Sequence, residues 1–233
     1  MSEVPQALMA AAINRCFEIE GLPKCIKIDN GEPLVYPAER DLPTLTVLWW
    51  IGLGIEVIYN KPRCPQQNGT IEGLQGICSR WSDPARKASI EALQSAVNEA
   101  NRIQRCVYRI RKQKYQTRMQ LYPQLATNPR RFDLQAFDFH RVKVYLAQKV
   151  WQRKVKKNGC IKLYKKEIYV ALHCVGQSLT VTYDPVESQW VIRAANGTLL
   201  KTSTKALITE EMIFNHVNMS RIPGVQLNGT LEG

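Results

Sequence analysis

Residues 41–62 of this 233-residue chain read DLPTLTVLWWIGLGIEVIYNKP. Asp41 is placed to cap a helix that runs to about Leu53, with Pro43 in its first turn. Residues 55–59 (IEVIY) then have the composition of a strand. The longest apolar run, residues 47–55, has only about half the length that a membrane span requires. We therefore expect a helix followed by a strand, in a protein that does not cross a membrane.

The sequence on both sides continues this alternation. Upstream, residues 4–17 are apolar at helical spacing, and residues 24–28 form a short strand that ends at an Asp-Asn-Gly turn. Downstream, a loop rich in proline leads to a helix at 70–81. Ser89 then opens a longer helix whose apolar stripe continues to Ile110. Helix, strand, helix, strand, helix, helix is typical of an α/β layer domain.

The pattern changes after Pro129. Residues 133–147 look helical, and six short strands with turn sequences between them follow, at 149–155, 160–164, 167–170, 178–183, 189–193 and 198–201. We expect a small antiparallel barrel whose core contains Trp151 and Trp190, rather than a platform on which bases stack. The predicted organisation is a first domain at 1–126, a linker and helix at 127–147, the barrel at 148–205 and a tail at 206–233.

The positive charge is concentrated in one part of the chain. The net charge is +12, yet residues 101–170 alone hold 19 basic and 3 acidic residues. An ordinary solvated face mixes both signs, so we expect nucleic acid as the partner. A solvated helix face and a basic protein-docking face are the alternatives. The expected phosphate contacts are Arg102, Arg105, Arg109, Arg111, Lys112 and Lys114 from the long helix, and Arg153, Lys154, Lys156 and Lys157 from the barrel.

Two carboxylates could carry chemistry. Asp29 follows a strand, and Glu72 lies in the first turn of a helix behind a PQQNG loop. If the two strands are neighbours, both side chains can reach one divalent metal ion, which favours oxygen ligands. The alternatives are that Asp29 belongs to a common turn sequence and that Glu72 only interacts with the helix dipole.

Taken together, residues 21–31 (GLPKCIKIDNG) and 52–72 (GLGIEVIYNKPRCPQQNGTIE) resemble the second half of the integrase catalytic core of bacterial insertion-sequence transposases. That core belongs to the ribonuclease-H-like DDE superfamily. The resemblance implies that Asp29 and Glu72 are catalytic and metal-binding residues, with Mg²⁺ or Mn²⁺ as cofactor in an active enzyme. It also implies a partial ribonuclease-H-like α/β core, followed by a small all-β barrel that binds DNA.

The resemblance is incomplete in two respects. The superfamily uses three carboxylates, and the first Asp, with the strands that carry it, has no counterpart here. On the Glu72 helix, Gly73 and Ser79 stand where the family often has basic residues, and Arg80 remains as a DNA-binding cation.

The resemblance therefore predicts an N-terminally truncated, DNA-binding member of the family that serves DNA transposition, integration and recombination of a mobile element. We expect little or no activity from it alone. Its expected partners are DNA and another copy of itself or a full-length transposase, without a membrane or a small-molecule substrate, in the nucleoid of the cytoplasm. The alternatives are a non-enzymatic interaction module that inhibits a full-length transposase and, ranked last, a metal-dependent nuclease.

Overall fold

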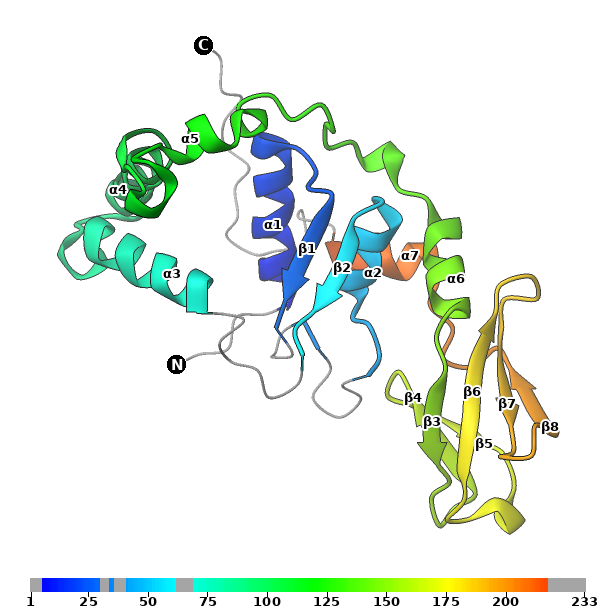
Figure 1. Cartoon of the computed structure of the whole chain (residues 1–233). Helices are drawn as coiled ribbons and strands as arrows, with labels where there is room; N and C mark the ends of the chain where they lie inside the picture. The colour runs from blue at the N-terminus through cyan, green and yellow to red at the C-terminus, as the bar shows by residue number, and fades with distance from the viewer. Residues whose placement is uncertain (1–5, 30–33, 36–40, 62–68, 218–233) are drawn as a thin grey trace. The chain divides into compact units, whose positions relative to one another are not determined.

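The computed structural model describes residues 6–29, 34–35, 41–61 and 69–217. Its fold is mixed α/β, which confirms the predicted class at that level (Figure 1). The chain forms two compact units. The discontinuous unit contains residues 1–19, 23–59 and 132–233, and the helical unit contains residues 20–22 and 60–131. The boundaries predicted at 126, 147 and 205 stay predictions.

A short parallel sheet lies near the start of the discontinuous unit. Helix α1 (Gln6–Glu20) precedes strand β1 (Cys25–Ile28). Strand β2 (Glu56–Tyr59) pairs with β1 in parallel. A parallel pair needs a crossover connection, which contains helix α2 (Leu45–Gly52). The sequence prediction of a helix between the two strands is therefore confirmed, and the structure shows in addition that the strands are neighbours.

Helix α2 is the centre of this unit. Thr46 to Gly52 are all buried, as expected of a helix that is apolar on every side. Its N-cap is Thr44, whose hydroxyl accepts from the amide of Val47 at 3.4 Å. The prediction that Asp41 is the cap is wrong: Asp41 lies one helical turn too early, and its carboxylate pairs with Arg153 instead.

An aromatic cluster covers α2. Trp49 stacks on Phe137 with ring centroids 5.0 Å apart, and Phe214 meets Trp49 edge-on at 5.6 Å. Trp49 also donates its indole N–H to the side chain of Asn14 on α1 at 2.9 Å. Gly52 leaves room for the Phe137 ring, which a Cβ at that position would overlap.

Phe214 belongs to helix α7 (Glu210–Val217), within the segment predicted to be a tail. That prediction is wrong for these residues, since Ile213 and Val217 are buried and α7 packs against α2. The helix has about two turns, too few for its apolar period to stand out in the sequence. Residues 218–233 of the predicted tail lie outside the described part of the chain.

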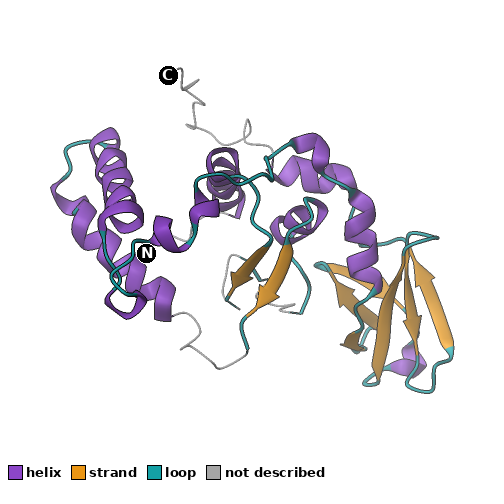
Figure 2. Cartoon of the chain, turned by 45° about the horizontal axis from the view of Figure 1, so that its top comes forward, coloured by secondary structure: helices purple, strands orange, loops and turns teal. Residues whose placement is uncertain are grey.

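The C-terminal strands are antiparallel, as predicted, and each lies within about two residues of its predicted position. One sheet has the order β3-β6-β7-β8, and β4 and β5 form a separate hairpin (Figure 1). The strands are drawn in orange in Figure 2. Within the described residues these strands do not close into a barrel. Trp151 and Trp190 are buried and meet edge-on at 5.6 Å, which confirms their predicted place in the core. The strands are β3 (Trp151–Lys154), β4 (Cys160–Leu163), β5 (Lys166–Tyr169), β6 (Ser178–Asp184), β7 (Gln189–Arg193) and β8 (Leu199–Ser203).

The helix predicted at 133–147 is broken. A 3₁₀ turn (Leu134–Ala136) comes first, and α6 (Phe139–Ala147) begins after Asp138, whose carboxylate accepts from the amide of His140 at 2.8 Å. The break places Phe137 against Gly52 and Trp49.

The helical unit contains α3 (Gly69–Ser82) and α4 (Ile90–Arg102), which pack against each other. Ser89 caps α4 as predicted, with its hydroxyl accepting from the amide of Ala92 at 3.2 Å. The predicted continuation to Ile110 is wrong. After Arg102 the backbone forms one π turn (Ile103–Val107), and the helix ends where the amide of Tyr108 donates to the carbonyl of Ile103 at 2.7 Å. The short helix α5 (Arg118–Leu121) follows.

Candidate nucleic-acid interface

Residues 109–118, which we call the basic loop, are closed by their own backbone. Ile110 and Gln116 form an antiparallel bridge, with the amide of Ile110 donating to the carbonyl of Gln116 at 3.0 Å. The amides of Gln113 and Tyr115 donate to the carbonyl of Ile110 at 2.9 and 3.1 Å. These bonds tie the two ends of the loop together, so the side chains at its tip leave from a defined backbone.

Two residues at the tip adopt left-handed backbone angles. Lys114 has φ 51° and Tyr115 has φ 60°, although neither is glycine or asparagine. Such angles cost on the order of 1 kcal/mol or more for each residue with a bulky side chain. The loop keeps them because its backbone hydrogen bonds allow few other paths, and stored strain of this kind is concentrated at functional sites.

Arg118 fixes the base of the loop. One guanidinium nitrogen donates to the carbonyl of Gln104 at 2.8 Å and to its side-chain oxygen at 2.7 Å. Gln104 is buried, and the guanidinium also lies over the ring of Tyr108 at 5.8 Å from its centroid. Thr117 and Gln120 form a capping box at the start of α5. Arg118 therefore connects the loop to the π turn and serves a structural role.

The predicted phosphate contacts of this segment fall into two groups. Arg102 pairs with Glu99 and Arg105 pairs with Glu20, each with an N–O distance of 2.7 Å. The hydrogen bond from Arg102 lowers the pKa of Glu99. The Arg102–Glu99 pair is exposed and the Arg105–Glu20 pair is partly exposed, so both contribute little to stability, and a phosphate could replace either carboxylate at small cost.

The cations of the second group are more available to a phosphate. Arg109, Arg111, Lys112 and Lys114 are exposed, and none of them forms an ion pair with any described residue. Arg109 donates only a long hydrogen bond, at 3.4 Å, to the carbonyl of Tyr115. Residues 101–132 contain nine basic residues and no acidic residue, so this group lies in a segment without compensating charge.

The cations of the β-sheet region are less available than predicted. Arg153 donates to both carboxylate oxygens of Asp41, at 2.7 and 3.0 Å, and to the carbonyl of Lys162. Its side chain is only 12% exposed, which assigns it to the packing of this unit. Lys156 pairs with Glu167 at 2.7 Å and lowers the pKa of that carboxyl by a hydrogen bond.

The other predicted cations are exposed. Lys154 and Lys157 are exposed, as is Arg80, whose Nε donates to the carbonyl of Gly76 in its own helix at 3.2 Å.

The two predicted catalytic carboxylates lie at the ends of elements, as expected. Asp29 directly follows β1 and is exposed, in the discontinuous unit. Glu72 is exposed in the first turn of α3, in the helical unit. In the described part of the chain, no group of three or more His, Cys, Asp or Glu side chains could hold a metal ion. We therefore derive no catalytic step through Mg²⁺ or Mn²⁺.

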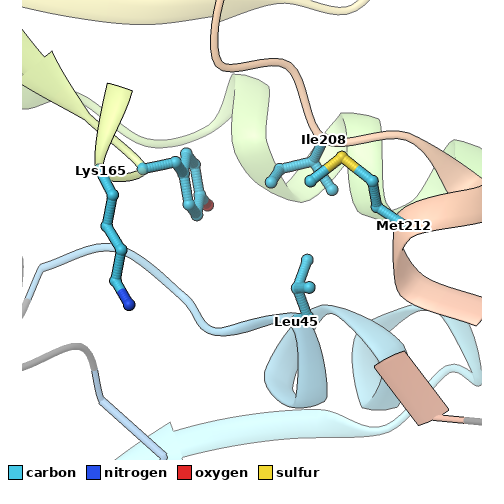
Figure 3. Close-up of a pocket in the computed structure, with 5 residues that line it drawn as sticks. Leu45, Lys165, Ile208 and Met212 are labelled. Atoms are coloured by element: carbon cyan, nitrogen blue, oxygen red, sulfur yellow. The ribbon is translucent and has the colours of Figure 1, made fainter. Parts of the chain in front are cut away.

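A small cavity in the discontinuous unit lies between the start of α2, the β4-β5 turn and the segment that leads into α7 (Figure 3). It has a volume of about 110 Å³ and is lined by Leu45, Tyr164, Lys165, Ile208 and Met212. Ligand pockets usually have volumes of about 300–1,000 Å³. The cavity is therefore a packing gap at the edge of the α7 contact, and the candidate interface remains the basic loop.

Comparison with known proteins adds no assignment. No protein-family model and no curated protein matches the chain. Within the described residues, no helix has both the length and the apolar character needed to cross a bilayer.

Sequence reasoning missed two parts of this interface. The sequence did not predict the basic loop, because the apolar stripe through Val107 and Ile110 indicated an unbroken helix. It also passed over exposed aromatic side chains beside the cations, namely Trp81, Tyr108 and Tyr115. The alternation of tyrosines with Arg and Lys at 108–118 was the available signal.

Proposed function

We propose that this chain is a DNA-binding protein of the insertion-sequence transposase type. The observation that carries the proposal is the basic loop, whose exposed cations lie in an acid-free stretch of the chain. A protein surface that binds a polyanion needs cations that are not already neutralised and that are held in place. The DNG and PQQNG motifs support the family, together with the parallel β1-β2 pair, whose first strand Asp29 directly follows.

The finer architecture belongs to the same proposal. We take the α1, β1, α2 and β2 elements as part of a ribonuclease-H-like core, and the β3–β8 region as the counterpart of the family's DNA-binding barrel. The order of the elements agrees with the helix-strand-helix-strand order, followed by short strands, that the sequence predicts. Lys154 and Lys157 would then add exposed cations from the second region.

We also propose that the chain alone carries out little or no strand transfer. The family reaction needs three carboxylates, and the sequence matches two of them, Asp29 and Glu72. A metal site deprived of one ligand loses affinity and geometry. A Mg²⁺-dependent joining reaction by the purified chain that disappears in the Asp29→Ala variant would overturn this part of the proposal.

DNA binding is tested by its salt dependence. Four cations that neutralise four phosphates give a slope of about −3.6 in log affinity against log salt, which is about 150-fold weaker binding at 200 mM than at 50 mM salt. The variant in which the four available cations are replaced by Gln should lose most of that slope. These residues are Arg109, Arg111, Lys112 and Lys114.

A matched control removes four exposed cations of the discontinuous unit that lie outside the β3–β8 region, namely Arg15, Lys24, Lys27 and Lys149. It has the same net charge as the loop variant, so it should retain the slope if the loop is the interface. Equal losses in both variants would mean that net charge alone attracts DNA. Absence of DNA binding by the unmodified chain would favour a protein-docking surface, as in an inhibitor of a full-length transposase.

A further inference from the structure

Among the described residues of the helical unit, four aromatic side chains are more than 40% exposed: Tyr122 follows α5, and the other three accompany the available cations. Trp81, Tyr108 and Tyr115 are 42%, 46% and 58% exposed. Exposed large apolar surface among charges often marks a binding site. The five tryptophans divide clearly: Trp81 is exposed, whereas the other four are at most 3% exposed.

Two of these rings are held in position. Trp81, at the end of α3, and Tyr108, at the end of the π turn, have ring centroids 6.5 Å apart at an interplanar angle of 58°. The guanidinium of Arg118 lies over the Tyr108 ring, and its bonds to buried Gln104 fix its own place. Tyr108 is thus supported by two neighbours while nearly half of its surface stays in solvent.

Tyr115 is presented differently. Its left-handed backbone lies at the tip of the basic loop, where its carbonyl accepts from Arg109 and its amide donates to Ile110. The ring has no role in closing the loop, because both of these contacts use backbone atoms. A bulky residue at a position that favours Gly or Asn, with its ring exposed, suits contact with a ligand better than it suits stability.

We infer that the three exposed rings and the basic loop together bind an unpaired segment of DNA. In this arrangement, bases stack on Trp81, Tyr108 and Tyr115, and the cations of the loop contact the phosphates. The inference rests on the proposed DNA-binding function and specifies its substrate. In a duplex the faces of the bases are already stacked on one another, so an exposed aromatic ring finds no partner there. A single strand offers base faces for stacking on the rings and phosphates for the cations. A second copy of the chain is a poor occupant, because the acid-free stretch would repel itself.

The experiment compares single-stranded and duplex oligonucleotides of equal phosphate number at one salt concentration, by fluorescence anisotropy. We expect tighter binding of the single strand. In Tyr115→Asn that binding should weaken by about 5- to 150-fold, the range for loss of one base stack, while duplex binding changes little. Asn tolerates the left-handed backbone, so the loop should keep its shape.

Two controls accompany the variant. Tyr122→Thr removes a similarly exposed ring just past α5, outside the basic loop and outside β3–β8, and should leave both affinities unchanged. Tryptophan fluorescence of the unmodified chain gives a second readout: a single strand should quench Trp81 and protect it from acrylamide, and an equal amount of bound duplex should not. This signal needs no substitution, so it remains informative if a variant fails to fold.

The outcomes separate the two proposals. If neither form of DNA binds, the proposed function and the inference both fail. If the duplex binds as tightly as the single strand, or if Tyr115→Asn weakens both equally or neither, the inference is overturned and the proposed function stands. Preference for the single strand, lost in Tyr115→Asn and accompanied by Trp81 quenching, supports both.

Discussion

Helix α2 and the basic loop are short segments that meet water in opposite ways. In α2 the seven residues from Thr46 to Gly52 are buried, and its conformation follows from burial and one hydroxyl cap. In the basic loop the tip residues are exposed, and the conformation follows from backbone hydrogen bonds that sustain two left-handed residues. Helix α2 is therefore stabilised by the residues that cover it, whereas the loop is held by its own backbone and is open to a ligand.

The largest loss of stability is expected when the buried Trp49 ring of α2 is removed. Trp49→Ala should lower the free energy of unfolding by about 3–5 kcal/mol, because it leaves a large cavity and strands the side chain of Asn14 without its indole donor. Chemical denaturation measures the change. The matched variant Trp81→Ala removes an exposed ring and should cost about 1 kcal/mol or less, so similar losses in both would contradict the contrast.

A smaller loss of stability is expected at Gly52, where the Phe137 ring packs closely against α2. Gly52→Ala places a methyl group into the Phe137 ring, and overpacking of this kind costs about 1–3 kcal/mol. Gly73→Ala on α3 is the control, since a Cβ there meets open space and alanine favours the helix. A Gly52→Ala variant as stable as the unmodified protein would show that Phe137 can move away at no cost.

The cover of α2 by α7 should depend on pH. His216 lies half-buried against Thr46, at 2.9 Å between Nε2 and Oγ1, and burial lowers its pKa below 6.5. The unfolded chain then binds the proton more readily, so stability falls as pH drops from 6.5 through the lower folded-state pKa. Thermal unfolding between pH 7.5 and 5.5 measures this loss. His216→Gln should remove it, whereas the exposed His140→Gln should not.

The smallest expected effect has the opposite sign. Lys114→Asn relaxes one left-handed residue and should raise the free energy of unfolding by about 0.5 kcal/mol. Under the proposed DNA-binding function the same change removes one cation from the interface and should reduce the salt slope of binding by about 0.9. A gain in stability together with weaker DNA binding would mean that the strained backbone at Lys114 is kept because the lysine serves binding. A loss of stability would mean that Lys114 makes a contact that outweighs its strain.

The sequence predicts much of the first region and little of the second. A continuous apolar run bounded by turn residues specified the helix–strand order around α2, because burial acts through residue type. The sequence did not reveal that Thr44 rather than Asp41 caps the helix, since both Thr and Asp are common N-cap residues. It also missed α7, where two turns of helix give too weak a period.

The basic loop could not be predicted in the same way. Its shape depends on a bridge between Ile110 and Gln116 and on left-handed angles at Lys114 and Tyr115, residue types that usually favour other conformations. The positive charge of the segment was visible in the sequence. Which cations are neutralised was not, because the partners of Arg105 and Arg153 lie far away along the chain, at Glu20 and Asp41.

The packing of Phe214 on Trp49 has a consequence for biosynthesis. The ring that completes the cover of α2 is translated long after α2 itself, and at about 5–20 residues per second the delay is roughly 10–30 s. During that interval the VLWWIG segment has left the ribosome without its final neighbour. Nascent chains should therefore engage chaperones that bind apolar segments until α7 has left the ribosome and packed on α2, and chains stalled before that point should aggregate.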